Sequence, residues 1–163
     1  MIGLKIIFLD FDGVLNSAKY RAGHPAYGVI IDPIRMALLK QIVDATHAKI
    51  VLSTSWREHW SNTSSECDDT GGQINHLFKT YGLQIFDKTP KLHEKRETEI
   101  KTWLDEHPEV DNFVVLDDMF LSADYLKGHF VKTSNYFDGL VETDTQQAIS
   151  ILNCKGISKH ETR

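Results

Sequence analysis

Short apolar runs rich in β-branched residues alternate along this chain with stretches whose apolar residues recur at helical spacing. The apolar runs cover residues 5–9, 49–53, 83–86, 112–116 and 129–132. Helical patterns begin at Pro33, after Asp32 as N-cap, extend from Glu97 to Glu106, and resume after a cap at Thr143 or Thr145. Strands that alternate with helices are joined by right-handed crossovers and form a mostly parallel sheet. We therefore expect an α/β fold, a three-layer sandwich of about five strands.

Length and charge narrow the class of protein. The chain has 163 residues and a net charge of -5, which predicts one domain and argues against stable binding of duplex nucleic acid. No stretch approaches the roughly 18 apolar residues of a membrane span. The apolar run at residues 6–9 ends at Asp10 and is too short for a signal peptide, so we expect a cytoplasmic protein with no membrane partner.

Two long irregular stretches interrupt the pattern of strands and helices. We expect a single domain over residues 1–155, with a short flap at about 14–32 and a small insert at about 58–90. The polar residues 156–163 are expected to form a flexible tail. Neither irregular stretch is long enough for a full additional domain over the carboxyl ends of the strands.

Polar and acidic residues follow three of the apolar runs. Asp10-Phe11-Asp12-Gly13 follows the first run, Ser53-Thr54-Ser55 ends the second, and Asp117-Asp118 follows the fourth. Ligands of open α/β sheets bind outside the carboxyl ends of the strands, so these groups are expected to meet. Several carboxylates in one crevice repel one another unless a cation or protons compensate. Oxygen ligands without a Cys/His cluster favour Mg²⁺.

The run Phe8-Leu9-Asp10-Phe11-Asp12-Gly13-Val14-Leu15 resembles the first motif of the haloacid dehalogenase (HAD) superfamily. Val51-Leu52-Ser53-Thr54 resembles its second motif, Lys95-Arg96 stands where the third motif supplies a cation, and Asp117-Asp118 resembles the fourth. The residue patterns around Trp56-Arg57 and after Arg96 are similar to those of HAD domains of RNA-repair proteins. The resemblance implies a Rossmann-like, HAD-like fold with a minimal cap or none.

The resemblance also implies roles for the four aspartates. Asp10 would be the nucleophile that attacks phosphorus, and Asp12 would be the general acid and base. Mg²⁺ would be held by Asp10, the backbone carbonyl of Asp12, and Asp118, the second residue of the acidic pair. Asp117 would support the site from behind these ligands.

Phosphate-binding residues are implied at the second and third motifs. Thr54 is the first choice for the hydroxyl that binds a phosphoryl oxygen, with Ser53 and Ser55 as rivals because strand ends slip by one residue. The third-motif cation is Arg96 by likeness to the RNA-repair group or Lys95 by likeness to the wider superfamily; Lys88 and Lys91 are further candidates.

The segment after the second motif leaves open whether its residues bind substrate or pack in the core. Arg57 is a candidate for gripping phosphate. Trp56 and Trp60 either stack on a base or pack together at helical spacing, and for Trp60 we favour packing.

The function expected from these motifs is that of a Mg²⁺-dependent phosphomonoesterase working through an aspartyl-phosphate. An open site suits a phosphorylated substrate such as a nucleotide or the terminal phosphate of a polynucleotide. The alternatives are small phosphorylated metabolites, phosphoproteins, another HAD reaction, or a non-catalytic binding module. Dehalogenation is disfavoured because Asp12, the second Asp of the DxD motif, is a feature of phosphatases.

Overall fold

A five-stranded parallel sheet forms the centre of the molecule, in the strand order β3-β2-β1-β4-β5. This is a computed structural model, and it describes residues 3–154. The strands are β1 (Leu4–Leu9), β2 (Lys49–Leu52), β3 (Ile85–Lys88), β4 (Val110–Asp117) and β5 (Phe130–Lys132). The α/β fold with about five parallel strands is therefore confirmed, and each expected strand is present within a few residues of its predicted position.

Five α-helices of the described residues lie between the strands or after the last of them, and no α-helix lies between β4 and β5. They are α1 (Ala18–Gly23), α2 (Pro33–Thr46), α3 (Asp69–Thr80), α4 (Arg96–Glu106) and α5 (Glu142–Asn153). Short 3-10 helices lie at η1 (Ser55–His59), η2 (Ser64–Glu66) and η3 (Asp124–Leu126). As predicted, α2 has Pro33 in its first turn, and the Asp32 side chain accepts a hydrogen bond from Ile34 N.

The predicted cap of the last helix is wrong. The α5 helix begins at Glu142, so that Thr143 and Thr145 lie inside it. The Asp144 carboxylate accepts a hydrogen bond from Val141 N at 3.1 Å, which satisfies a free N–H group at the start of the helix. A side chain three residues into the helix does this capping, whereas the sequence prediction relied on a threonine before it.

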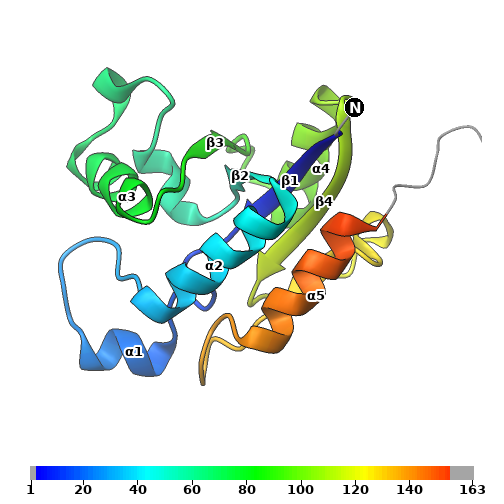
Figure 1. The fold of residues 1–163 in the computed structure, drawn as a ribbon. Coiled ribbons are helices and arrows are strands. Elements are labelled where there is room, and N and C mark those ends of the chain that lie inside the picture. The colour runs from blue at the N-terminus through cyan, green and yellow to red at the C-terminus, as the bar shows by residue number, and fades with distance from the viewer. Residues whose placement is uncertain (1–2, 155–163) are drawn as a thin grey trace, which may run out of the picture.

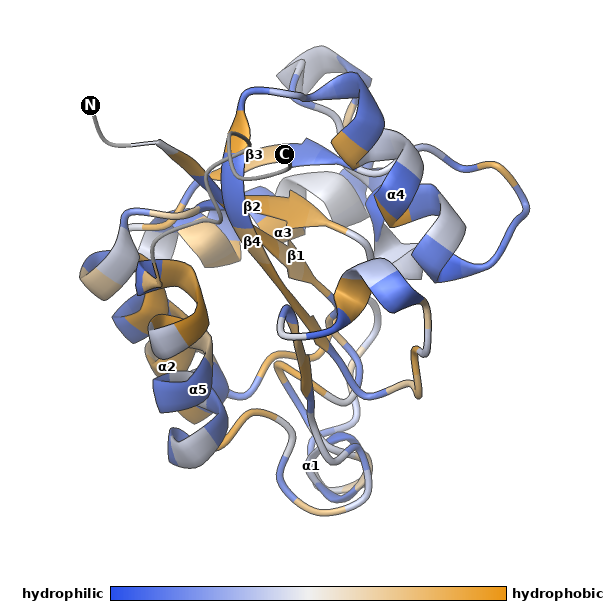
Figure 2. Ribbon diagram, turned by 90° about the vertical axis from the view of Figure 1, so that its right-hand side faces the viewer, coloured by the Kyte–Doolittle hydropathy of each residue, from blue (hydrophilic) through white to orange (hydrophobic). Residues whose placement is uncertain are grey.

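The two faces of the sheet are covered by different helices, as the hydropathy colouring of Figure 2 shows for α2 and α5 on one side and α4 on the other. Alternate residues of β1 supply the two cores: Ile7 and Leu9 pack with α2, α3 and α5, and Ile6 and Phe8 pack with α4. Because its central strands are buried on both faces, the sheet is a rigid platform for the groups at its carboxyl ends.

The segment between β1 and α2, predicted as a flap, contains the short helix α1 and lies beyond the carboxyl ends of the strands (Figure 1). The loop after β5 is joined to it, because Asn135 accepts hydrogen bonds from Ala18 N through its backbone oxygen and from Arg21 through its side chain. Gly13 O accepts a hydrogen bond from Thr133 Oγ1 at 2.6 Å. The two loops therefore support each other beside the end of β1.

No helix within residues 3–154 is long and apolar enough to cross a membrane. The division into one domain with a flap and an insert stays a prediction. The tail predicted at 156–163 lies outside the described residues.

Candidate active site

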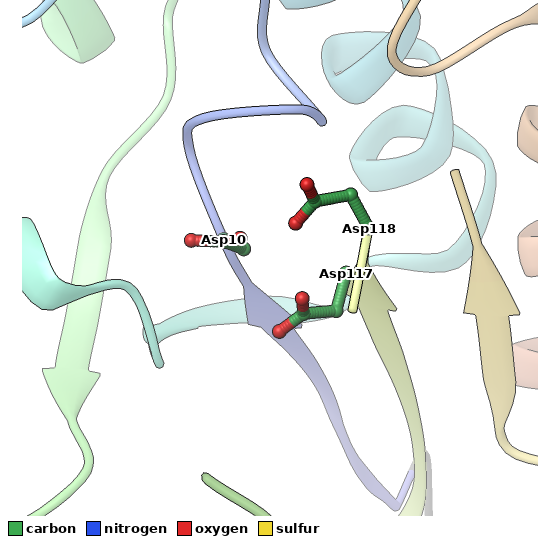
Figure 3. A group of neighbouring side chains, drawn as sticks. All are labelled: Asp10, Asp117 and Asp118. Carbon is green, nitrogen blue, oxygen red and sulfur yellow. The ribbon is translucent and has the colours of Figure 1, made fainter. Parts of the chain in front are cut away.

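Three carboxylates meet where β1 and β4 end side by side. Asp10 follows β1, Asp117 is the last residue of β4, and Asp118 comes next. Each of the three offers an oxygen within 4.8 Å of the others. Figure 3 shows Asp117 and Asp118 extending from β4 towards Asp10. The meeting expected from parallel strand ends is thus present, because β1 and β4 pair in register up to Leu9 and Leu116.

Asp10 lies in an unusual electrostatic setting. Its side chain is almost buried, and its Oδ2 lies 3.1 Å from Arg96 Nη1. Burial raises the pKa of Asp10 to about 7; Arg96 opposes this rise, and the neighbouring charges of Asp117 and Asp118 add to it. Burial also raises the pKa of Asp118. The cluster therefore carries more negative charge than its one guanidinium balances.

The two residues of the acidic pair differ in their surroundings. Asp117 is fully buried, and its carboxylate accepts hydrogen bonds from Arg96 Nη1 at 2.7 Å and from Met119 N at 2.9 Å. Asp118 is only half-buried, and its carboxyl group lies directly against Gly13. A Cβ on Gly13 would stand 2.5 Å from Asp118 Cγ, and the backbone there has a φ of +83°, so glycine is required twice over.

Asp12 lies in a different environment from Asp10. Its side chain is 46% exposed and has a guanidinium, that of Arg21, no nearer than 4.0 Å. Its two oxygens accept hydrogen bonds from Asn16 Nδ2 at 3.0 Å and Trp56 Nε1 at 3.1 Å. The sequence did not point to Asn16 as part of the site. Its short spacing from Asp12 predicts a contact only when the turn at Gly13 is known.

The polar residues at the end of β2 occupy three different environments. Ser53 continues the pairing with β1 through its N–H, which donates to Leu9 O at 3.0 Å, and its buried Oγ has no hydrogen-bond partner among the described residues. Thr54 is also buried, and its Oγ1 accepts a hydrogen bond from Trp56 N. Ser55 is exposed at the start of η1.

Among the predicted cations, Arg96 reaches the carboxylates. It is the first residue of α4, whereas Lys95 is the exposed N-cap residue before it. Lys88 Nζ instead donates hydrogen bonds to the backbone oxygens of Arg57 and Trp60. Lys91 pairs with Glu58 at 2.7 Å.

Arg57 makes its hydrogen bonds to groups outside the acidic cluster. Its guanidinium is 2.9 Å from Glu99 Oε2, and it donates to the backbone oxygens of Thr54, Thr89 and Pro90. These contacts give Arg57 a part in holding η1 against α4. Trp60 is buried, with its Nε1 donating to Asn75, in agreement with the expectation that it packs in the core.

The donor set fits a hard divalent cation. Three carboxylates supply oxygen ligands, and the surplus of negative charge gives a cation a reason to bind. Asp118 is the least engaged of the three and is free to turn an oxygen towards an ion, whereas Asp117 is held by Arg96 and Met119.

The parallel sheet with an acidic cluster at its carboxyl edge defines an α/β protein of the HAD type. A family described as the HAD domain in Swiss Army Knife RNA repair proteins matches residues 6–145. The chain belongs to this family, which is the relationship that its motifs predicted. Comparisons with curated proteins and with solved structures gave no significant match.

Proposed function

We propose that this protein is a Mg²⁺-dependent phosphomonoesterase whose nucleophile is Asp10. The observation that carries the proposal is the convergence of Asp10, Asp117 and Asp118 around one arginine at the end of the central strands. A HAD domain is consistent with a phosphohydrolase in general.

The reaction proceeds in two displacements. An oxygen of Asp10 forms a bond to phosphorus while the bond to the ester oxygen breaks, and Asp12 donates a proton to that oxygen. Water then attacks phosphorus and gives a proton to Asp12, the bond between Asp10 and phosphorus breaks, and inorganic phosphate leaves. Asp12 is suited to this exchange because its half-exposed carboxyl group is accessible to both leaving group and water.

Asp10, Asp118 and the backbone carbonyl of Asp12 would hold the Mg²⁺. When bound, the ion offsets the repulsion between the carboxylates and the phosphoryl oxygens. Arg96 and Asp117 hold the rear of the cluster: Asp117 keeps Arg96 beside Asp10, and Arg96 partly neutralises the nucleophile between turnovers.

Ser53 and Thr54 are the groups proposed to bind a phosphoryl oxygen. The Ser53 hydroxyl is the stronger candidate, because a buried hydroxyl without a partner carries an energetic cost that a ligand would remove. Thr54 Oγ1 already accepts from Trp56 N but keeps its own hydrogen to donate. Ser55 and Arg57 are less suited, since one is exposed and the other is paired with Glu99.

The proposed substrate is the terminal phosphate of a nucleotide or polynucleotide. The family description names RNA repair. The loops after β1, β4 and β5 carry large exposed aromatic side chains, namely Tyr27, Phe120, Tyr136 and Phe137. Exposed aromatic rings can stack on nucleobases, and they do so with little preference for one base over another. These loops lie at the same end of the sheet as the acidic cluster (Figure 1).

The test is turnover of p-nitrophenyl phosphate with Mg²⁺ and with EDTA, followed by a panel of phosphorylated oligonucleotides, nucleotides, sugar phosphates and phosphopeptides. We expect metal-dependent release of phosphate, and a loss of at least about 10³-fold in Asp10→Asn. Lys101→Ala, at an exposed position in the middle of α4, is the control. Wild-type rates in Asp10→Asn would reject the covalent mechanism, and faster turnover of sugar phosphates than of oligonucleotides would reject the substrate class.

A further inference from the structure

The orientation of Asp12 is not explained by packing. Its side chain is 46% exposed, and a carboxyl group in that setting rotates among several positions unless specific contacts hold it. Both oxygens nevertheless have a donor: Oδ1 accepts from Asn16 Nδ2 at 3.0 Å and Oδ2 from Trp56 Nε1 at 3.1 Å. These two contacts approach the carboxylate from different loops and fix its plane.

The position of the Trp56 ring is itself fixed. Trp56 lies in η1 directly after β2, and its backbone N–H donates to Thr54 Oγ1. The ring is partly buried against the larger hydrophobic core. The next residue, Arg57, anchors η1 to α4 through Glu99 at 2.9 Å. The end of β2 thus supplies a rigid indole N–H to a carboxylate that follows β1.

The amide of Asn16 can adopt one orientation. It is fully buried, its Oδ1 accepts hydrogen bonds from Gly13 N and from the Arg21 guanidinium, and its Nδ2 donates to Ile30 O as well as to Asp12. A flipped amide would place its NH₂ against two donors and its oxygen against two acceptors. The N–H that faces Asp12 is therefore determined by the surrounding contacts.

We propose that Trp56 and Asn16 are positioning residues that hold Asp12 for proton transfer. Each carboxyl oxygen has two lone pairs, so one donor on each oxygen leaves a site for the leaving-group oxygen or the attacking water. Both contacts use neutral donors and restrict rotation of the carboxyl group. This role rests on the proposed function, since Asp12 needs a fixed direction only if it transfers a proton to substrate.

The experiment measures how kcat/KM depends on the basicity of the leaving group. We use a series of aryl phosphates that runs from p-nitrophenyl through phenyl to p-methoxyphenyl phosphate. The size of the leaving group stays nearly constant, while its oxygen becomes more basic and depends more on protonation by a general acid. The parameter kcat/KM reports the first displacement, in which Asp12 acts as acid. The second displacement is the same for every ester, so it does not obscure the comparison.

In Trp56→Phe we expect the loss of kcat/KM to grow along the series, reaching about 10- to 100-fold for the most basic leaving groups, part of the contribution of a general acid. Trp60→Phe is the matched control, since it removes an indole N–H that donates to Asn75 rather than Asp12. Its loss is expected to be equal for every ester. A purely structural role for Trp56 would also give an equal loss.

Parallel plots for wild type and Trp56→Phe, or the same steepening in Trp60→Phe, would overturn the proposal and leave the phosphatase function standing. Asn16→Leu provides a second variant of nearly the same size, with the donor to Asp12 removed and no charge added beside it, and the same steepening is expected there. If wild type releases no phosphate from any ester with Mg²⁺, the proposed function fails and this role fails with it.

Discussion

Two ion-pair regions lie one helical turn apart on α4, and they differ in balance. Arg57 and Glu99 are paired at 2.9 Å with exposures of 8% and 9%, and both make further hydrogen bonds: Glu99 Oε2 also accepts from Leu92 N, and Arg57 donates to three backbone oxygens. Around Arg96, by contrast, Asp10 and Asp117 are both in contact and Asp118 adds a third carboxylate. One region is electrically complete, and the other holds a surplus of negative charge.

The difference in charge balance distinguishes an ion pair that supports the fold from a cluster that can bind a ligand. A buried pair with all its hydrogen bonds made keeps segments together, and its removal leaves an uncompensated charge. A surplus of buried carboxylates costs free energy in the folded state unless a cation or protons arrive. Mutation of the Arg57–Glu99 pair is therefore expected to change mainly the stability of the protein. Mutation of the three aspartates is expected to change mainly how that stability depends on pH and on metal.

The largest effect on stability is expected from the completed pair. Glu99→Ala leaves the Arg57 guanidinium buried without its anion and should lower the free energy of unfolding by about 3–5 kcal/mol, as urea denaturation would measure. Asp105→Ala is the matched control, because it breaks an exposed pair with Lys101 on the same helix and should cost less than about 1 kcal/mol. Similar losses in both variants would show that the buried pair contributes no more to stability than the exposed one.

The second effect is a dependence of stability on pH in the presence of EDTA. Because burial raises the pKa of Asp10 to about 7, the folded protein holds a proton that the unfolded chain releases near pH 4. Stability from this group is fully present below pH 4 and is lost as pH rises through 7, by roughly 4 kcal/mol in all. In Asp10→Asn the curve of unfolding free energy against pH should flatten over that window. A wild-type curve that rises from pH 5 to 8 would contradict the assignment.

The smallest effect is stabilisation by Mg²⁺ at pH 8. A metal that binds the folded protein alone adds about 2.7 kcal/mol at one hundred times its Kd, seen as a higher Tm. Asp118→Asn should reduce this shift, because it removes the least engaged ligand, whereas Asp105→Ala should leave it intact. An equal shift in Asp118→Asn and wild type would place the ion elsewhere.

Much of the fold and part of the site could be predicted from the sequence. The meeting of Asp10 with Asp118 could be expected because local apolar patterns mark where β1 and β4 end, and parallel strands bring their carboxyl ends to one edge of the sheet. The choice between Lys95 and Arg96 depends on the residue at which α4 begins, and sequence patterns leave that uncertain by a residue or two.

Other features of the site depend on long-range pairing that no local pattern encodes. Arg57 was a candidate for phosphate binding, and its partner Glu99 is 42 residues away on another element. Trp56 was considered for base stacking, yet its ring N–H faces Asp12, 44 residues earlier, because η1 turns the chain back over the end of β1. The orphaned hydroxyl of Ser53 is likewise visible only once its neighbours are in place.

The contact between Gly13 and Asp118 links two distant positions in the evolution of this chain. A methyl group at position 13 and an acidic side chain at position 118 would compete for the same volume. A side chain at position 13 therefore meets two penalties while the aspartate is in place, one steric and one from the backbone conformation, and loss of the aspartate removes only the steric one. The glycine would then be free to drift only as far as its left-handed backbone allows.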